Sequence, residues 1–178
     1  MPRHPYQYMD RIDPDDLNVF QKILLKTDGT LTEILEAYVS ENIHVVKLSE
    51  KFISGIPHTE ILDITPDREV IERKILLQGM RTGKNWLYAE SFIIPDRLGI
   101  NFRNDLITSG IPIGKLWKTH RIETFKEMIA VFREPSCHIG ACFGIRAEES
   151  LLCRTYRVFS NQKPVMMITE KFPETYYV

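Results

Sequence analysis

Hydrophobic and polar residues alternate over much of this chain, and this pattern predicts strands. Side chains of a strand point to its two faces in turn. The alternation marks strands over residues 43–48, 70–77, 86–94, 151–159 and 165–172, and the first of them can extend to residue 53. Polar turns at 79–85 and 161–164 join neighbouring strands, so we expect two antiparallel hairpins.

The opening of the chain has helical spacing instead. Asp13 suits an N-cap and Pro14 the first helical position, and the helix that they predict ends at Asp28-Gly29. Its apolar stripe consists of Leu17, Phe20, Ile23 and Leu24. Thr30 and Glu33 have the spacing of a capping box, so a second helix is expected to begin there.

The middle of the chain is less regular. A helical turn is expected near residues 103–109, and residues 109–114 read as a turn. Residues 122–132 are compatible with either a helix or a strand, and residues 133–149 with a loop or a broken segment. The whole pattern predicts an α+β fold in a single domain over residues 1–178.

Charged residues lie on apolar faces of two predicted strands. Arg73 shares its face with Ile71, Ile75 and Leu77, and Glu170 shares its face with Met166, Ile168 and Phe172. A charge buried alone costs several kcal/mol, so each must be paired or bind something. The pattern leaves two interpretations open: Arg73 and Glu170 pair with each other, or they face a closed pocket for a small anionic ligand.

A second arginine adds to the positive charge expected inside. Arg154 lies on the face of Leu152, Tyr156 and Val158. Two arginines to one carboxylate favour a ligand that carries a carboxylate, which a guanidinium binds through two hydrogen bonds. Glu90, on the predicted face of Trp86, Tyr88 and Phe92, could neutralise one arginine.

Composition narrows the functional classes. The 178 residues are 43% hydrophobic and 26% charged, with a net charge of −1, which gives no electrostatic reason to expect nucleic acid or a membrane surface as a partner. No apolar run approaches a membrane span, and residues 1–6 lack the apolar segment of a secretory signal. Three cysteines fit a reducing cytoplasm. Cys137, His138, Cys142 and Cys153 are scattered without a C-x-x-C pair, so we expect no metal site.

Several motifs together resemble one enzyme family. Residues 73–77, followed by a turn, Trp86 and a strand that ends at Pro95, resemble the chorismate pyruvate-lyases. Residues 111–114 are similar to the Pro-Leu-Gly turn of that family. Arg154-Thr155, Lys163-Pro164 and residues 169–173 then follow in the family's order. The likeness spans residues 15–175 and is greater to the uncharacterised archaeal-type branch than to the bacterial enzymes of ubiquinone synthesis.

The resemblance implies a fold and a reaction. The fold is a single antiparallel sheet of about six strands, with helices packed against it and flaps that close an internal ligand site. The reaction splits chorismate into pyruvate and 4-hydroxybenzoate without a metal or organic cofactor. The segment 133–150 aligns poorly with the bacterial enzymes and is expected to form a flap or an interface.

The resemblance also assigns residues. Arg73 matches the arginine that holds the ring carboxylate, and Glu170 matches the glutamate near the ring hydroxyl. Leu31 and Ile113 match positions that contact the carboxylate, which we expect to occur through backbone groups. From its facing alone, Arg154 is a candidate for holding the second carboxylate. Glu170, if unpaired, would favour its neutral form and could take the ring C4 proton or assist the departing ether oxygen. Alternatively, the hydrogen passes within the substrate.

A second class of function remains open. The same fold serves as the ligand-sensing domain of bacterial transcription regulators, which place a winged-helix domain ahead of it. About 40 residues precede the first predicted strand here, too few for such a domain. A stand-alone sensor or carrier of aromatic acids is therefore the alternative to a lyase. The sequence leaves the oligomeric state open, including a homo-oligomer.

Overall fold

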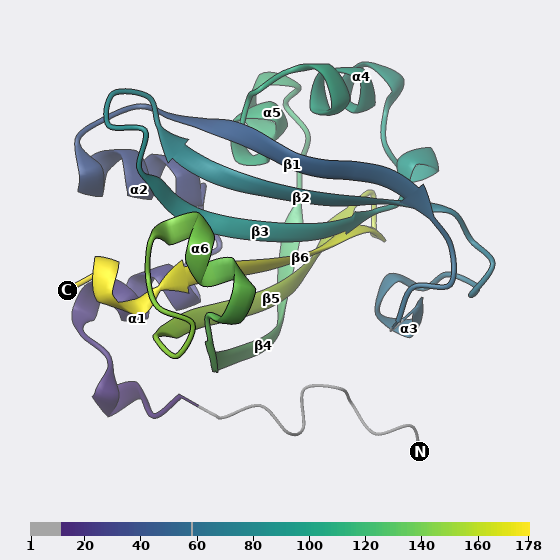
Figure 1. The fold of residues 1–178 in the computed structure, drawn as a ribbon. Helices are drawn as coiled ribbons and strands as arrows, with labels where there is room; N and C mark the ends of the chain where they lie inside the picture. Colours follow the sequence, from purple (N-terminus) through teal and green to yellow (C-terminus); the bar gives the residue numbers. More distant parts are fainter. Residues whose placement is uncertain (1–11, 58) are drawn as a thin grey trace.

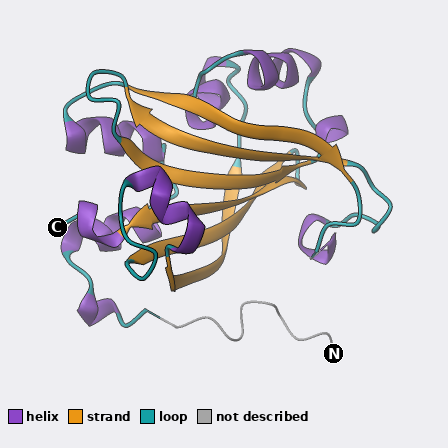
Figure 2. Ribbon diagram, viewed as in Figure 1, coloured by secondary structure: helices purple, strands orange, loops and turns teal. Residues whose placement is uncertain are grey.

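A computed structural model describes residues 12–57 and 59–178, so the prediction about residues 1–6 falls outside the described residues. Within these ranges, six strands form one antiparallel sheet in the order β1-β2-β3-β6-β5-β4 (Figures 1 and 2). The strands are β1 Ile43–Ile53, β2 Val70–Gly79, β3 Asn85–Ile93, β4 Phe125–Pro135, β5 Ser150–Ser160 and β6 Lys163–Pro173. Both predicted hairpins, β2–β3 and β5–β6, are confirmed.

Helices cover both faces of this sheet. The α-helices are α1 Val19–Lys26, α2 Leu31–Val39, α3 Thr59–Leu62, α4 Ile100–Thr108, α5 Ile113–Thr119 and α6 Gly140–Phe143. Short 3-10 helices are η2 Pro14–Asp16, η3 Pro95–Arg97, η4 Cys137–Ile139 and η5 Glu174–Tyr176. In Figure 1, α6 lies in front of the strands, and α4 and α5 lie beyond the β1 edge. The prediction of an α+β fold with one antiparallel sheet is confirmed.

The alternation of side chains divides the core between the two faces. The larger cluster joins α1, α2, α4 and α5 to the sheet, and it contains Leu77. The preceding residue, Leu76, belongs to a smaller cluster on the opposite face, beneath α6. A third cluster joins α3 to β2 and β6. Burial of these apolar side chains is the main force that holds the helices on the sheet.

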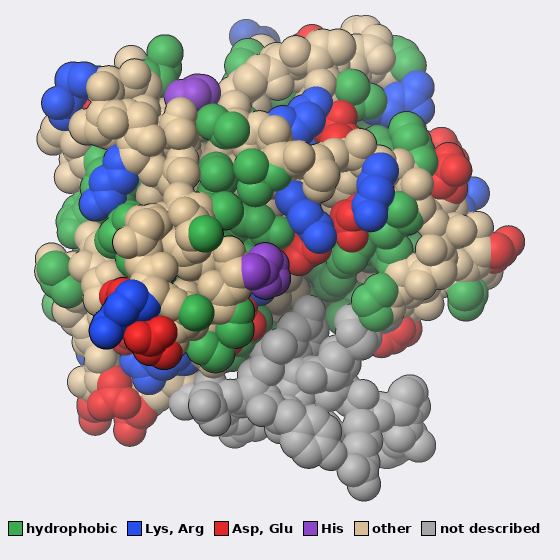
Figure 3. Space-filling model, viewed as in Figure 1, with side chains coloured by type: hydrophobic (Ala, Val, Ile, Leu, Met, Phe, Trp, Pro, Cys, Tyr) green, Lys and Arg blue, Asp and Glu red, His purple; other side chains and the backbone are tan. Residues whose placement is uncertain are grey.

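The face that α6 covers pairs its charges locally. Lys51 lies 3.1 Å from Glu72, and Lys74 lies 3.1 Å from Glu90. Basic and acidic side chains are mixed on this side of the molecule (Figure 3). Glu90 therefore points away from the larger cluster, and the prediction that it could neutralise an inward arginine is wrong, because it pairs with a lysine on its own face.

The predicted helix starts need correction. Asp13 caps η2 and not α1, because the backbone at Leu17 is extended (φ −109°, ψ 139°) and interrupts the helix. Asn18 caps α1 instead, in a reciprocal capping box with Gln21. Helix α2 does follow Thr30, but the Thr30 side chain makes no capping hydrogen bond, and Glu33 pairs with Lys118.

The irregular middle contains more structure than its sequence predicts. Residues 125–135 form β4, which resolves the choice between helix and strand. The expected turn at 109–114 runs directly into α5. Residues 137–143 form η4 and α6 over the smaller core cluster. Across the residues that the structure describes, no helix is long and apolar enough to cross a lipid bilayer.

Candidate functional site

A partly enclosed cavity lies between the sheet and the N-terminal ends of α2 and α5. The space between its walls amounts to about 700 Å³, open solvent at its mouth included. Most of its wall is apolar. The polar side chains that line it are those of Thr30, Thr32, Arg73, Ser91, Lys126, Tyr156 and Glu170. The cavity is the candidate for the internal ligand site that the resemblance implies.

Arg73 lines the cavity and is 4% exposed. Its Nε lies 3.5 Å from a Glu50 carboxylate oxygen, and neither Nε nor Nη2 has a hydrogen-bond partner among the described residues. Burial lowers the pKa of Arg73, and the charge of Glu50 offsets part of this effect. Buried guanidinium donors without partners are costly, so Arg73 has donors available for an anion.

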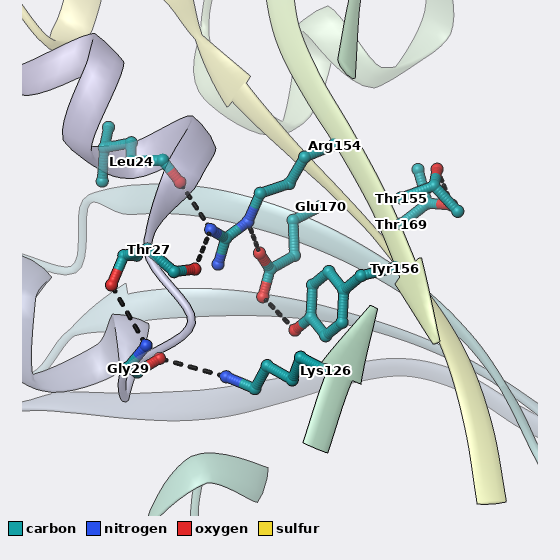
Figure 4. A network of polar contacts seen from close by, with 9 residues as sticks. All are labelled: Leu24, Thr27, Gly29, Lys126, Arg154, Thr155, Tyr156, Thr169 and Glu170. Atoms are coloured by element: carbon teal, nitrogen blue, oxygen red, sulfur yellow. Dashed lines mark hydrogen bonds and ion pairs between the residues drawn. The ribbon is translucent and has the colours of Figure 1, made fainter. Parts of the chain in front are cut away.

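Arg154 has a different environment, although its side chain is also buried. Its Nε donates to Glu170 Oε2 at 2.6 Å, and its Nη1 donates to the backbone carbonyls of Leu24 at 2.6 Å and Thr27 at 2.8 Å (Figure 4). Its Nη2 has no partner among the described residues. Arg154 is completely buried and is not one of the side chains that line the cavity. The predicted contact between Arg154 and a second carboxylate stays a prediction.

Glu170 lines the cavity with both carboxylate oxygens in hydrogen bonds. Oε2 accepts from Arg154, and Oε1 accepts from the Tyr156 hydroxyl at 2.9 Å (Figure 4). Burial raises the pKa of Tyr156 well above its usual value, so Tyr156 is a neutral donor. One of the two open interpretations is wrong, because Arg73 and Glu170 pair with other residues and not with each other; the pocket for an anionic ligand stays a prediction. The condition of an unpaired Glu170 is not met either.

Leu31 and Ile113 both line the cavity as the first residues of α2 and α5. The first backbone N–H groups of an α-helix have no partner within the helix, so they are available to a ligand. The two helix ends approach closely at Gly114, where an added Cβ would lie 2.8 Å from Thr30 Cγ2. Both residues assigned by the resemblance thus line the cavity, and their contact with a carboxylate stays a prediction.

Lys126 is the main cavity residue that sequence reasoning missed. It lies on β4, and its Nζ donates to the Gly29 carbonyl at 3.0 Å and lies 5.5 Å from the centre of the Tyr156 ring. Burial lowers the pKa of Lys126. In the structure, Lys126 lies opposite Val158 on the inward face of the sheet. The pattern of residues 122–132 is compatible with a helix as well as a strand, so it does not predict that Lys126 points inward.

The cysteines do not assemble into a metal site. Among the described residues, no three His, Cys, Asp or Glu side chains gather in a way that could hold a metal ion. Cys137 is exposed, and Cys153 is buried beneath α6. Burial raises the pKa of the Cys153 thiol, which keeps it protonated. The groups that face the cavity are suited to hold an organic anion.

Comparison with known proteins agrees with this chemistry. Residues 25–177 match the family described as chorismate pyruvate-lyase Rv2949c-like. This chain belongs to the chorismate pyruvate-lyase family. A chorismate pyruvate-lyase of Mycobacterium leprae is 30% identical over 152 residues, which are 85% of this chain and 72% of that protein. A protein of Methanocaldococcus jannaschii is 27% identical over 154 residues, covering 85% and 77% of the two chains.

The fold is also shared with an effector domain of known structure. The effector domain of PhnF from Mycobacterium smegmatis has a TM-score of 0.64 with 10% identity, covering 83% of this chain and 90% of that one. Similarity at this level of identity concerns the fold alone. The predicted family and the predicted fold are therefore both confirmed for this chorismate pyruvate-lyase family member.

Proposed function

We propose that this protein is a chorismate pyruvate-lyase that converts chorismate into 4-hydroxybenzoate and pyruvate. The observation that carries the proposal is the buried Arg73, whose donors face an apolar cavity in a member of this family. The reaction needs no metal or organic cofactor, and its substrate is a small organic dianion. With its three cysteines free, we expect the enzyme to act in the cytoplasm.

Arg73 orients the substrate in this proposal. Its Nε and Nη2 form a planar pair of donors that matches the ring carboxylate. The backbone N–H groups of Leu31 and Ile113 add further donors from the cavity wall. Holding the ring in one orientation removes part of the entropic barrier to the reaction.

Glu170 lies at the other end of the proposed reaction. The hydrogen leaves C4 of the ring, the ether bond at C3 breaks, and the ring becomes aromatic with its hydroxyl at C4. The released enolpyruvate gains a proton at its methylene carbon and becomes pyruvate. Glu170 either accepts the C4 proton or stabilises the changing charge while the hydrogen passes within the substrate. Arg154 is then a positioning residue, because it holds Glu170 and the end of α1.

Binding without turnover is the second candidate function. Two observations favour it: the fold is shared with an effector domain, and both oxygens of Glu170 already accept hydrogen bonds. In that case the protein would be a sensor or carrier of aromatic carboxylates.

The test is incubation of purified protein with chorismate, with pyruvate and 4-hydroxybenzoate measured separately. We expect the two products in equal amounts. Arg73→Ala and Glu170→Gln should each abolish turnover in a folded protein, whereas Arg81→Ala, at an exposed turn, should not change it. A fully active Glu170→Gln variant would reject the acid–base role.

Other outcomes separate the two candidates. Absence of turnover together with tight binding of 4-hydroxybenzoate would favour the sensor. Neither turnover nor binding would reject both functions.

A further inference from the structure

Lys126 is a charged cavity residue to which the proposed reaction gives no role. It lines the inner cavity and also an adjoining outer hollow, which Lys118 and Arg121 border as well. Thr30, Gly114 and Trp117 are shared in the same way. These shared residues lie where the two spaces border each other, a place that we call the throat. Arg73 borders the inner cavity and not the outer hollow.

The ammonium group of Lys126 is available for a ligand. It donates one hydrogen bond, to the Gly29 carbonyl, and forms no ion pair with any described residue. A lysine has three N–H donors, so two remain. The nearby carboxylate of Glu170 is occupied by Arg154 and Tyr156, and Asp28 lies on the outer side, beside the hollow. Lys126 is thus a partly desolvated cation at the throat without an anionic partner of its own.

Arg73 and Lys126 lie on the same face of the sheet, on strands near its opposite edges. Strands β3, β6 and β5 lie between β2, which carries Arg73, and β4, which carries Lys126. Four strand spacings amount to about 19 Å between the two backbones in a flat sheet, and the two long side chains shorten this gap. Two cations on separated strands of one cavity suit a ligand that carries a carboxylate at each end.

We propose that Lys126 determines specificity by binding the second carboxylate of a dicarboxylate ligand while Arg73 binds the first. The identity of the ligand rests on the proposed function: for chorismate, the second carboxylate is that of the enolpyruvyl group. The preference for a dicarboxylate rests on the position of the two cations. Lys126 takes the place that facing alone had suggested for Arg154, whose Nε and Nη1 are already bonded within the protein.

The test compares two ligands on matched variants. Lys126→Met removes the charge at similar length, Arg73→Met does the same at the inner site, and Lys118→Met is the control in the outer hollow, where Lys118 pairs with Glu33. Calorimetry measures the Kd of 4-hydroxybenzoate for each variant. If a variant does not turn chorismate over, calorimetry also measures the Kd of chorismate. If it does turn chorismate over, the KM of chorismate is measured instead. Circular dichroism checks the fold, and Lys126→Arg, which keeps the charge, should retain binding.

We expect Lys126→Met to lower the affinity for chorismate by about tenfold or more, because one charge-assisted hydrogen bond is lost. The affinity for 4-hydroxybenzoate should stay within about twofold of the wild-type value. Arg73→Met should weaken both ligands, and Lys118→Met neither. Equal loss of both ligands in Lys126→Met, or loss of neither, would overturn the proposal. Wild-type protein that binds chorismate without releasing pyruvate would reject the lyase function and leave the Lys126 comparison measurable.

Discussion

Two buried arginines on neighbouring parts of one sheet face have opposite surroundings. Arg154 donates to a carboxylate and to two backbone carbonyls, whereas Arg73 faces one carboxylate oxygen at 3.5 Å without a hydrogen bond. Strand periodicity detects both as inward charges but cannot separate them. The difference comes from the end of α1, whose carbonyls accept hydrogen bonds from Arg154. Among the described residues, α1 makes no such contact with Arg73. We therefore interpret Arg154 as structural and propose Arg73 as the residue that binds the ligand.

The largest expected effect is on stability. Arg154→Met should lower the free energy of unfolding by about 3–5 kcal/mol, because Glu170 and two carbonyls lose their buried partner. Arg73→Met should change it by less than about 1 kcal/mol, or raise it, since no internal hydrogen bond is lost. Urea denaturation without ligand measures both. Equal losses in the two variants would contradict the comparison.

A smaller effect is expected where the two helix ends meet beside the cavity. Gly114→Ala should cost about 1–3 kcal/mol, because the new Cβ would lie 2.8 Å from Thr30 Cγ2. It should also lower the affinity for 4-hydroxybenzoate if the N–H groups of Leu31 and Ile113 bind the carboxylate together with Arg73. Gly99→Ala is the matched control, since no atom lies within 4 Å of its added Cβ and its φ is −59°. An unchanged affinity in Gly114→Ala would mean that these N–H groups do not bind the ligand.

Lys126 should resemble Arg73 in contributing to binding and not to stability. Its pKa is lowered by burial, so the unfolded chain binds more protons than the folded protein between the folded-state pKa and the ordinary value near 10.4. Stability due to Lys126 therefore rises with pH through that window. Lys126→Met should be more stable than the wild type by about 1 kcal/mol at pH 7, and the gap should shrink toward pH 10. Urea denaturation at both pH values measures it, and a gap independent of pH would contradict the desolvation argument.

The smallest effect concerns the carboxylate beside Arg73. Glu50→Gln removes a negative charge that lies 3.5 Å from the Arg73 Nε, so the affinity for 4-hydroxybenzoate should rise about threefold. Stability should change by less than about 1 kcal/mol, because Glu50 also pairs with a half-exposed Lys47. Glu69→Gln, at an exposed position before β2, is the control. A Glu50→Gln variant with unchanged affinity would mean that Glu50 does not compete with the ligand.

Sequence alone predicts the sheet better than the site. Alternation places Arg73, Arg154 and Glu170 correctly on the face of the larger core cluster, because a one-residue error would expose every apolar side chain of a strand. Their partners are not predictable from it, since Arg154 bonds to main-chain carbonyls far away in the chain.

Local irregularities account for the other differences. In β4, a bulge between Met128 and Ala130 breaks the period of two, and so Lys126 went unnoticed. The extended backbone at Leu17 splits the predicted first helix, although Asp13 and Pro14 are good helix starters. In each case a local irregularity of the backbone changes the structure in a way that regular spacing of apolar residues does not predict.

The bonds from Arg154 to Leu24 and Thr27 also have a consequence for the order of folding during synthesis. They join residues 130 and 127 positions apart, so the end of α1 is made early and its partner late. An eight-residue helix is marginal by itself in water, and α1 must wait for β5 before its last carbonyls are satisfied. A ribosome-bound chain that ends before residue 154 should therefore contain the β1–β2–β3 meander with an undocked α1. The ligand cavity would be completed only when the final hairpin arrives.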